Sequence, residues 1–198
     1  MNYNDNHKNY KKPLTLGTAQ FGLNYGITNN IGKVISEIAI DIIRKAISKG
    51  VKYIDTAASY GESEEIIGRA LSGKSFSEIK IITKLFPFEQ EFINNINETT
   101  LKKLIRNSIS TSLNNLKCSK IYTLMFHRIE HLLNNQIVNE ILNLKEEGLI
   151  DNIGVSIQNI SELKFALTKD FISRIQMPFN ILDYRWDEAA NLIKAIKK

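Results

Sequence analysis

The chain has 198 residues, of which 43% are hydrophobic and 24% are charged. This composition is typical of a globular protein and excludes collagen-like, mucin-like and wholly disordered chains. Lys and Arg number 26 against 21 Asp and Glu, and the resulting net charge of +5 is largely spread along the chain. We therefore expect no nucleic-acid partner, whereas phosphate-bearing metabolites fit the small cationic excess.

The sequence also indicates a location for the protein. The single cysteine, Cys118, has no partner for an internal disulfide, which indicates a reducing compartment. No apolar run is long enough to span a bilayer, and residues 1–12 lack the apolar core of a secretory signal. We expect a cytoplasmic protein without membrane contact, with a flexible lead over residues 1–12 and one domain over residues 13–198.

Short apolar runs alternate with longer amphipathic segments along the domain. Six runs predict buried strands, at residues 14–18, 53–55, 79–84, 121–127, 153–156 and 174–178. Helical spacing of apolar residues predicts helices around residues 38–47, 66–71, 101–116, 138–144, 163–167 and 189–196. The first of these helices has Ser36 as its expected N-cap and Gly50 as the residue after its C-cap.

The strand and helix pattern, repeated six times, is typical of parallel α/β folds. A Rossmann sheet would need a G-x-G-x-x-G turn after its first strand, and residues 16–22 (LGTAQFG) do not provide it. A complete (β/α)₈ barrel typically takes about 250 residues. We therefore predict an incomplete TIM-type (β/α) barrel with about six of the eight strand–helix units.

Ionisable residues end three of the predicted strands, at Asp55, Lys84 and His127. The carboxyl ends of barrel strands form the functional face, and burying such groups singly is costly, so we expect them to meet there. The loop after Asp55 brings Tyr60 over the same end. Lys84, held by Asp55, is expected to lower the pKa of Tyr60 so that the phenol can donate a proton near neutral pH. A neutral His127 would orient a substrate oxygen.

This arrangement predicts carbonyl chemistry, in which a proton goes to oxygen and a hydride goes to carbon. No side chain can donate a hydride, so a nicotinamide cofactor is implied. We expect no metal site, because no group of ligand residues has a metal-binding spacing.

The residues at these positions resemble the aldo-keto reductase family. The matching stretches are Gly17-Thr18-Ala19-x-Phe21-Gly22, Asp55-Thr56-Ala57-x-x-Tyr60-Gly61-x-Ser63-Glu64, Thr83-Lys84 and His127. The resemblance runs over about residues 14–183 and implies a catalytic tetrad of Asp55, Tyr60, Lys84 and His127. It implies reduction of a small aldehyde or ketone to an alcohol, or the reverse, with Tyr60 as the general acid or base. Residues 18–29 are similar to reductases of bacterial surface-sugar pathways, which implies a sugar-related substrate.

The resemblance also implies the cofactor, NADPH, with NAD as the alternative. The residues at family positions that line the nicotinamide are Gly17, Thr18, Asp55, Ser156, Gln176 and Asn180. The chain departs from the family pattern at Ile157, where the family usually has Asn, and Asn159 follows two residues later.

The location of several other side chains can be interpreted in two ways. Four aromatic residues are candidates for a substrate wall, with packing in the core or at the rim as the alternative: Tyr25, Phe86, Phe88 and Trp186. The histidines His7 and His131 are expected in exposed loops.

A second function stays open. In the family, the seventh and eighth strands carry the groups that grip the pyrophosphate and the adenosine, and the chain holds six units. The alternatives to an enzyme are a non-catalytic module that binds nucleotide or oligomerises, a gene remnant, and a regulatory subunit that senses nicotinamide redox state. The open barrel edges favour self-association.

Overall fold

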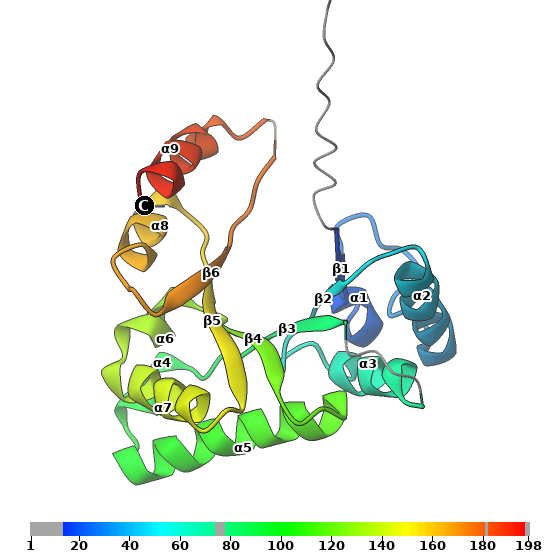
Figure 1. The fold of residues 1–198 in the computed structure, drawn as a ribbon, viewed down its shortest axis with the longest axis horizontal. Helices are drawn as coiled ribbons and strands as arrows, with labels where there is room; N and C mark the ends of the chain where they lie inside the picture. Colours follow the sequence, from blue (N-terminus) through cyan, green and yellow to red (C-terminus); the bar gives the residue numbers. More distant parts are fainter. Residues whose placement is uncertain (1–13, 74–77, 181, 197–198) are drawn as a thin grey trace, which may run out of the picture.

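The computed structural model of the chain describes residues 14–73, 78–180 and 182–196 (Figure 1). The predicted lead over residues 1–12 and His7 lie outside the described residues. Six parallel strands form one sheet in the order β1-β2-β3-β4-β5-β6. Their bounds are Thr15–Gly17 (β1), Tyr53–Asp55 (β2), Lys80–Lys84 (β3), Ile121–Phe126 (β4), Ile150–Ser156 (β5) and Ile172–Gln176 (β6).

Helices connect the strands and lie along the outer side of the curled sheet (Figure 1). The longer ones are α2 (Ser36–Ser48), α3 (Ser63–Leu71), α5 (Glu98–Leu116), α7 (Asn135–Glu146), α8 (Ile160–Ala166) and α9 (Asp187–Ile196). The sheet does not close within the described residues, and β1 and β6 form its two edges. The fold is therefore the incomplete (β/α) barrel that the sequence predicts.

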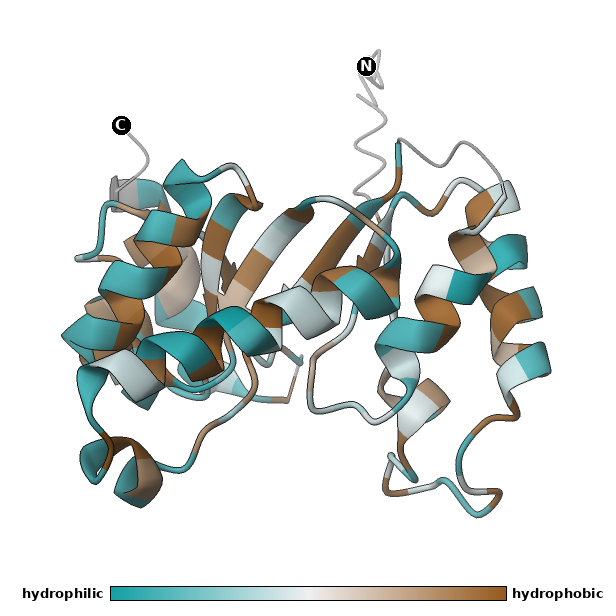
Figure 2. Ribbon diagram, turned by 90° about the horizontal axis from the view of Figure 1, so that it is seen from below, coloured by the Kyte–Doolittle hydropathy of each residue, from teal (hydrophilic) through white to brown (hydrophobic). Residues whose placement is uncertain are grey.

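Two apolar clusters join the helices to the sheet. The larger one packs α5, α7 and α8 against β4 and β5, and the smaller one packs α2 and α3 against β2. Figure 2 colours the strands mainly brown, whereas teal turns interrupt the outer helices. The apolar residues of β2 to β5 are thus mostly buried against the helices, whereas β1 and β6, at the two edges of the sheet, are partly or largely exposed.

Some element boundaries differ from the sequence prediction. Strand β5 begins three residues early because Ile150 pairs with Ile121 and is buried. Helix α2 begins at Ser36 itself with Ile35 in the cap position, so the prediction of Ser36 as N-cap is wrong. The left-handed conformation at Gly50, with φ of 91°, is confirmed.

Short helices at the carboxyl ends of the strands were not predicted, because a single turn carries no periodic signal. They are α1 (Ala19–Gly22), α4 (Gln90–Asn94), α6 (Ile129–Leu133) and the 3₁₀ turn η1 (Tyr184–Trp186). His131 lies in α6 and is 1% exposed, so its prediction as an exposed loop residue is wrong. Its Nε2 lies 2.9 Å from the carbonyl oxygen of Phe88, which provides the polar partner that a buried imidazole requires.

Burial lowers the pKa of His131, so this side chain is neutral at pH 7.

Within the described ranges, no helix combines the length and the apolar content needed to cross a bilayer.

Candidate active site

The strands bring the predicted site residues to the carboxyl end of the sheet. Five of the strands end on such residues, which are Gly17 (β1), Asp55 (β2), Lys84 (β3), Ser156 (β5) and Gln176 (β6). His127 directly follows β4. Gly17 pairs with Asp55, and Ser156 pairs with Gln176, so the parallel register aligns the carboxyl ends. Side chains far apart in sequence therefore share one face.

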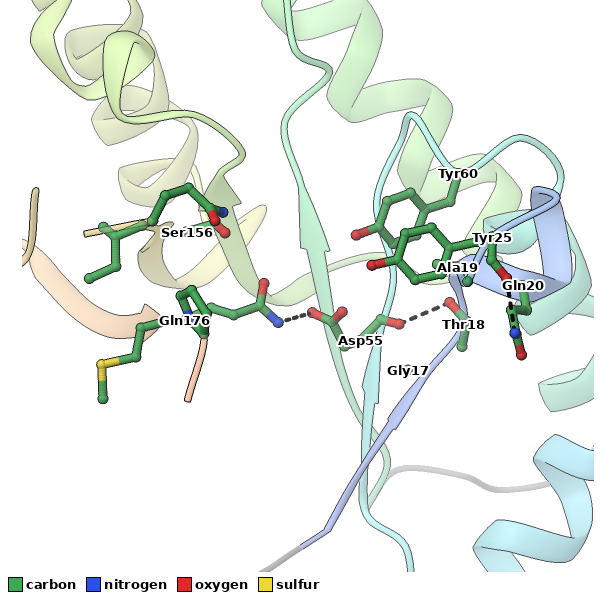
Figure 3. Close-up of a pocket in the computed structure, with 14 residues that line it drawn as sticks. Gly17, Thr18, Ala19, Gln20, Tyr25, Asp55, Tyr60, Ser156 and Gln176 are labelled. Atoms are coloured by element: carbon green, nitrogen blue, oxygen red, sulfur yellow. Dashed lines mark hydrogen bonds between the residues drawn. The ribbon is translucent and has the colours of Figure 1, made fainter. Parts of the chain in front are cut away.

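A cavity of about 520 Å³ opens at this face (Figure 3). Its lining residues are Gly17, Thr18, Ala19, Gln20, Tyr25, Gly26, Asp55, Tyr60, Ser156, Ile157, Gln158, Gln176, Met177 and Pro178. Five of the six residues expected at the cofactor are in this set. Asn180 is not, and its Oδ1 instead accepts a hydrogen bond of 2.9 Å from the backbone N–H of Leu182.

Lys84 and Asp55 form a buried ion pair beneath the cavity. The Lys84 ammonium donates to both carboxylate oxygens of Asp55 and to the carbonyl oxygen of Thr56, each at 2.9 Å. Its side chain is 2% exposed, and burial lowers its pKa while Asp55 opposes that shift. Gln176 donates a further hydrogen bond of 3.1 Å to Asp55 Oδ1 from the opposite side of the cavity. All three ammonium protons thus have acceptors, which is what a buried cation requires.

Tyr60 lies directly above this pair. The Lys84 ammonium is 4.9 Å from the centre of the Tyr60 ring. Burial, followed by the negative charge of Asp55, raises the pKa of Tyr60 to about 12. The sequence-based expectation of a lowered pKa is wrong for this structure, because burial penalises the phenolate and the carboxylate of Asp55 also opposes its negative charge. The phenol is therefore protonated at neutral pH.

His127 faces Tyr60 across the site. The two rings meet edge to face with centroids 6.0 Å apart, and the hydroxyl of Ser59 lies 3.4 Å from Nδ1 of His127. Burial lowers the pKa of His127 to about 4, and the charges of Lys84 and Arg128 act in the same direction. The imidazole is neutral at pH 7, in agreement with the expected state.

A chain of buried hydroxyl groups holds the backbone around the ion pair. Thr56 donates to Ser63 at 3.1 Å, the Ser63 hydroxyl donates to the Thr18 hydroxyl at 2.7 Å, and Thr18 donates to the carbonyl oxygen of Asp55 at 2.9 Å. All three hydroxyl side chains are fully buried. This chain ties the start of α3 to the ends of β1 and β2. Sequence analysis placed these residues in a motif without assigning them a contact.

Glu64, the next residue of the same motif, reaches the neighbouring strand. Its carboxylate accepts a hydrogen bond of 2.6 Å from Thr83, the residue before Lys84, and further side-chain hydrogen bonds from Ser112 and Asn115. Burial raises the pKa of Glu64. The motif thus fixes β3 relative to α3 and α5. The sequence signal that could have indicated this contact is an acidic residue, Glu64, at the end of the matched motif.

The four aromatic candidates for a substrate wall are separated by the fold. Tyr25 lines the cavity. Phe86 and Phe88 contact each other, with ring centroids 5.5 Å apart, and do not line it. Trp186 is 2% exposed and belongs to the larger apolar cluster, so it packs in the core.

The structure also places the two residues after β5 at which the chain departs from the family pattern, Ile157 and Asn159. Ile157 is fully buried, and its backbone N–H donates to the carbonyl oxygen of Gln176. The side chain of Asn159 caps α8 by accepting from the backbone N–H of Glu162 at 2.9 Å. Neither residue delivers a carboxamide to the cavity lining.

The donor set of the cavity fits one part of a dinucleotide. The hydroxyl of Ser156 and the carboxamide of Gln176 are suited to a nicotinamide carboxamide, and Gly17 leaves open space, because a Cβ there would meet no atom within 4 Å. None of the 14 lining residues is Lys or Arg. The residues present therefore fit a nicotinamide ring and provide no cation for phosphate groups.

Comparison with known proteins gives a consistent family. The sequence model of the Aldo/keto reductase family matches residues 13–198. The chain is 29% identical over 160 residues to an uncharacterized oxidoreductase of Bacillus subtilis, YqkF, a match that covers 79% of this chain and 52% of the relative. It is 32% identical over 151 residues to D-arabinose 1-dehydrogenase of Saccharomyces cerevisiae, which covers 73% of this chain and 42% of that enzyme.

Comparison with solved structures gives the same family. The holo form of an aldo-keto reductase from Bacillus halodurans superposes with a TM-score of 0.71 at 25% identity, over 92% of this chain and 58% of that one. The chain spans about half the length of the curated relatives that it matches.

Proposed function

The chain belongs to the aldo/keto reductase family, and from this premise we propose that it reduces an aldehyde or ketone to an alcohol with NAD(P)H, or catalyses the reverse reaction. One observation carries the proposal. A protonated phenol, Tyr60, lines the cavity directly above the buried pair of Lys84 and Asp55. A proton donor beside a fixed cation is what carbonyl reduction requires of a protein.

In this proposal Tyr60 donates its proton to the substrate oxygen during reduction and takes it back during oxidation. Its high pKa in the described structure keeps the proton in place before the reaction. The Lys84 ammonium, 4.9 Å from the ring centre, stabilises the phenolate that forms as the proton leaves. Asp55 keeps the ammonium in position, and neutral His127 offers a hydrogen bond that orients the substrate oxygen.

A bound nicotinamide dinucleotide, NADPH or NADH, supplies the hydride. We propose that Gly17, Thr18, Ser156 and Gln176 hold its nicotinamide half, because they line the cavity beside Asp55. Asn180 remains a weaker candidate, since its side chain is bonded to its own loop.

We further propose a sugar-related substrate. Two relatives are named as sugar enzymes, the D-arabinose 1-dehydrogenase of yeast and the L-galactose dehydrogenase of Arabidopsis thaliana, which is 29% identical over 133 residues. The polar groups of the cavity lining suit a substrate with several hydroxyl groups.

The test uses the purified 198-residue chain, with NADPH binding followed by fluorescence and carbonyl reduction followed by NADPH consumption. Tyr60→Phe should lower kcat/KM by about 10²-fold or more and leave NADPH affinity unchanged, because it removes only the transferable proton. Tyr184→Phe is the matched control, since Tyr184 is 81% exposed and outside the cavity lining. Unchanged turnover in Tyr60→Phe would contradict the proposal.

A second function is favoured by the open sheet, in which β1 and β6 are edge strands within the described residues. In that case the chain is a non-catalytic module that oligomerises through these edges or binds nicotinamide nucleotides without turnover. Saturable NADPH binding with no turnover of any carbonyl compound would support the module over the enzyme.

A further inference from the structure

Four side chains from four strands meet away from the cavity. They form what we call the basic–aromatic cluster, which consists of Tyr53 on β2, Lys80 on β3, Tyr122 on β4 and Arg174 on β6 (strands labelled in Figure 1). None of the four residues lines the cavity. Lys80 begins the strand that Lys84 ends, so these two residues lie about 13 Å apart along β3.

The phenol of Tyr122 contacts both cations of the cluster. Nη2 of Arg174 donates a hydrogen bond of 3.0 Å to the Tyr122 hydroxyl oxygen. The Lys80 ammonium lies 4.9 Å from the centre of the Tyr122 ring and 5.4 Å from the centre of the Tyr53 ring, which are cation–π distances. The two rings meet edge to face with centroids 6.2 Å apart. An ammonium and a guanidinium thus share one phenol.

The positive charges of the cluster have no carboxylate partner. Within the described ranges, neither cation of the cluster forms an ion pair with Asp or Glu. The lysines that precede β2 and β4 are paired, by contrast, Lys52 with Glu78 at 3.0 Å and Lys120 with Asp151 at 2.7 Å. Two like charges around one phenol repel each other, and an anion bound between them would offset this repulsion.

The ionisation of Tyr122 agrees with a positive potential at the cluster. The hydrogen bond from Arg174 lowers the pKa of Tyr122, burial opposes this shift, and the charges of Arg174 and Lys80 lower the pKa further. Arg174 is exposed, and the other three side chains of the cluster are partly exposed. A ligand from solution can therefore reach the two cations.

We propose that the basic–aromatic cluster binds a phosphate group, as the free ion or as part of a small metabolite. The planar guanidinium of Arg174 can donate two parallel hydrogen bonds to a phosphate, and the Lys80 ammonium adds a point charge. The Tyr122 hydroxyl accepts from Arg174 and keeps its own proton to donate to a further phosphate oxygen. A phosphate is favoured over a carboxylate because it brings up to two negative charges to two cations. The inference does not depend on the proposed function.

Isothermal titration calorimetry of the purified chain with inorganic phosphate tests the site. We expect saturable binding, and Arg174→Gln and Lys80→Gln should each weaken it by about tenfold, because each variant loses one charge-assisted interaction with the anion. Lys120→Gln is the matched control, since it removes one positive charge from a paired lysine beside β4, and it should leave the affinity unchanged. Absence of saturable binding, or an equal loss of affinity in Lys120→Gln, would overturn the inference.

Two further probes distinguish the kinds of ligand. Tighter binding of glycerol phosphate than of inorganic phosphate would support the site as one for phosphorylated metabolites, and the reverse order would support it as a site for the free ion. Acetate carries a single charge and should bind at least about tenfold more weakly than phosphate. Acetate binding as tight as phosphate binding would contradict recognition of a phosphate group.

A second measurement follows the phenolate of Tyr122. Phosphate should raise the pKa of Tyr122, because a bound anion offsets the two cations that favour the phenolate. Phenolate absorbance is titrated against pH with and without phosphate at equal ionic strength, in the unmodified chain and in Tyr122→Phe, and the difference between the two chains isolates Tyr122. A difference titration that phosphate leaves unchanged would contradict binding beside this phenol.

Discussion

At the scale of single residues, the buried ion pair of Lys84 and Asp55 is the interaction of the site that is most costly to break by removing one partner. The two side chains are 2% and 14% exposed. Removing one partner from a buried pair leaves an uncompensated charge, whereas replacing both charges can be nearly neutral. The pair is therefore expected to be required for activity, while its net contribution to stability is small.

Lys84→Met should abolish carbonyl reduction and destabilise the fold by about 3–5 kcal/mol, because the Asp55 carboxylate stays buried without its cation. The measurement is urea denaturation, alongside the turnover assay. The double variant Asp55→Asn with Lys84→Met is the control, since it removes both charges. It should recover much of the lost stability and none of the turnover. A double variant as unstable as the single one would contradict this account.

At the scale of elements, the turn after β1 packs directly against the loop that carries Tyr60. A Cβ added at Gly22 in α1 would overlap the carbonyl group of Tyr60. Gly61 has φ of 53° and faces the carbonyl oxygen of Gly22. Backbone therefore lies against backbone at this contact, which allows no relief by rotation of a side chain.

Gly22→Ala should destabilise the fold by about 3 kcal/mol and displace Tyr60, because the added methyl group forces the two backbone segments apart. Gly17→Ala is the matched control for stability, since its Cβ would meet nothing within 4 Å, and it should change the free energy of unfolding by less than about 1 kcal/mol. Thermal denaturation of both variants provides the comparison. Equal stability of the two variants would show that the contact is not tight.

At the scale of the whole molecule, β1 is an edge strand of the sheet, and α2 with its cap carries an exposed apolar stripe. Ile35, Ile38 and Ile42 follow helical spacing along α2 and its cap and are 63%, 52% and 39% exposed. Unpaired parallel edges and contiguous apolar side chains favour association. We expect copies of the described chain to associate with each other through this face.

Sedimentation analysis should show a monomer–dimer equilibrium that Ile38→Lys shifts toward monomer, because a charge in the stripe must be desolvated on association. Ser48→Lys adds the same charge at an exposed polar position of α2 and should leave the equilibrium unchanged. Identical behaviour of the two variants would contradict association through the stripe.

The sequence predicted the site best where an ionisable residue ended an apolar run. Asp55 and Lys84 end their strands and His127 follows its strand, and the carboxyl ends of parallel barrel strands form the functional face. His131 was mispredicted because its burial depends on α6, a single turn whose spacing carries no periodic signal. The pKa of Tyr60 was mispredicted because the burial of the phenol, which is the largest cause of the rise, and the negative charge of Asp55 were not weighed against Lys84.

The sequence by itself determined the order of strands and helices, the parallel sheet and the identity of the residues at its carboxyl edge, because these follow from apolar periodicity and from motifs local to the chain. Only the tertiary structure decided which groups lie around the cavity, Tyr25 among them, and the protonation state of the Tyr60 phenol. These properties depend on burial and on the distance between side chains from different strands and loops, and neither quantity is encoded in any one segment.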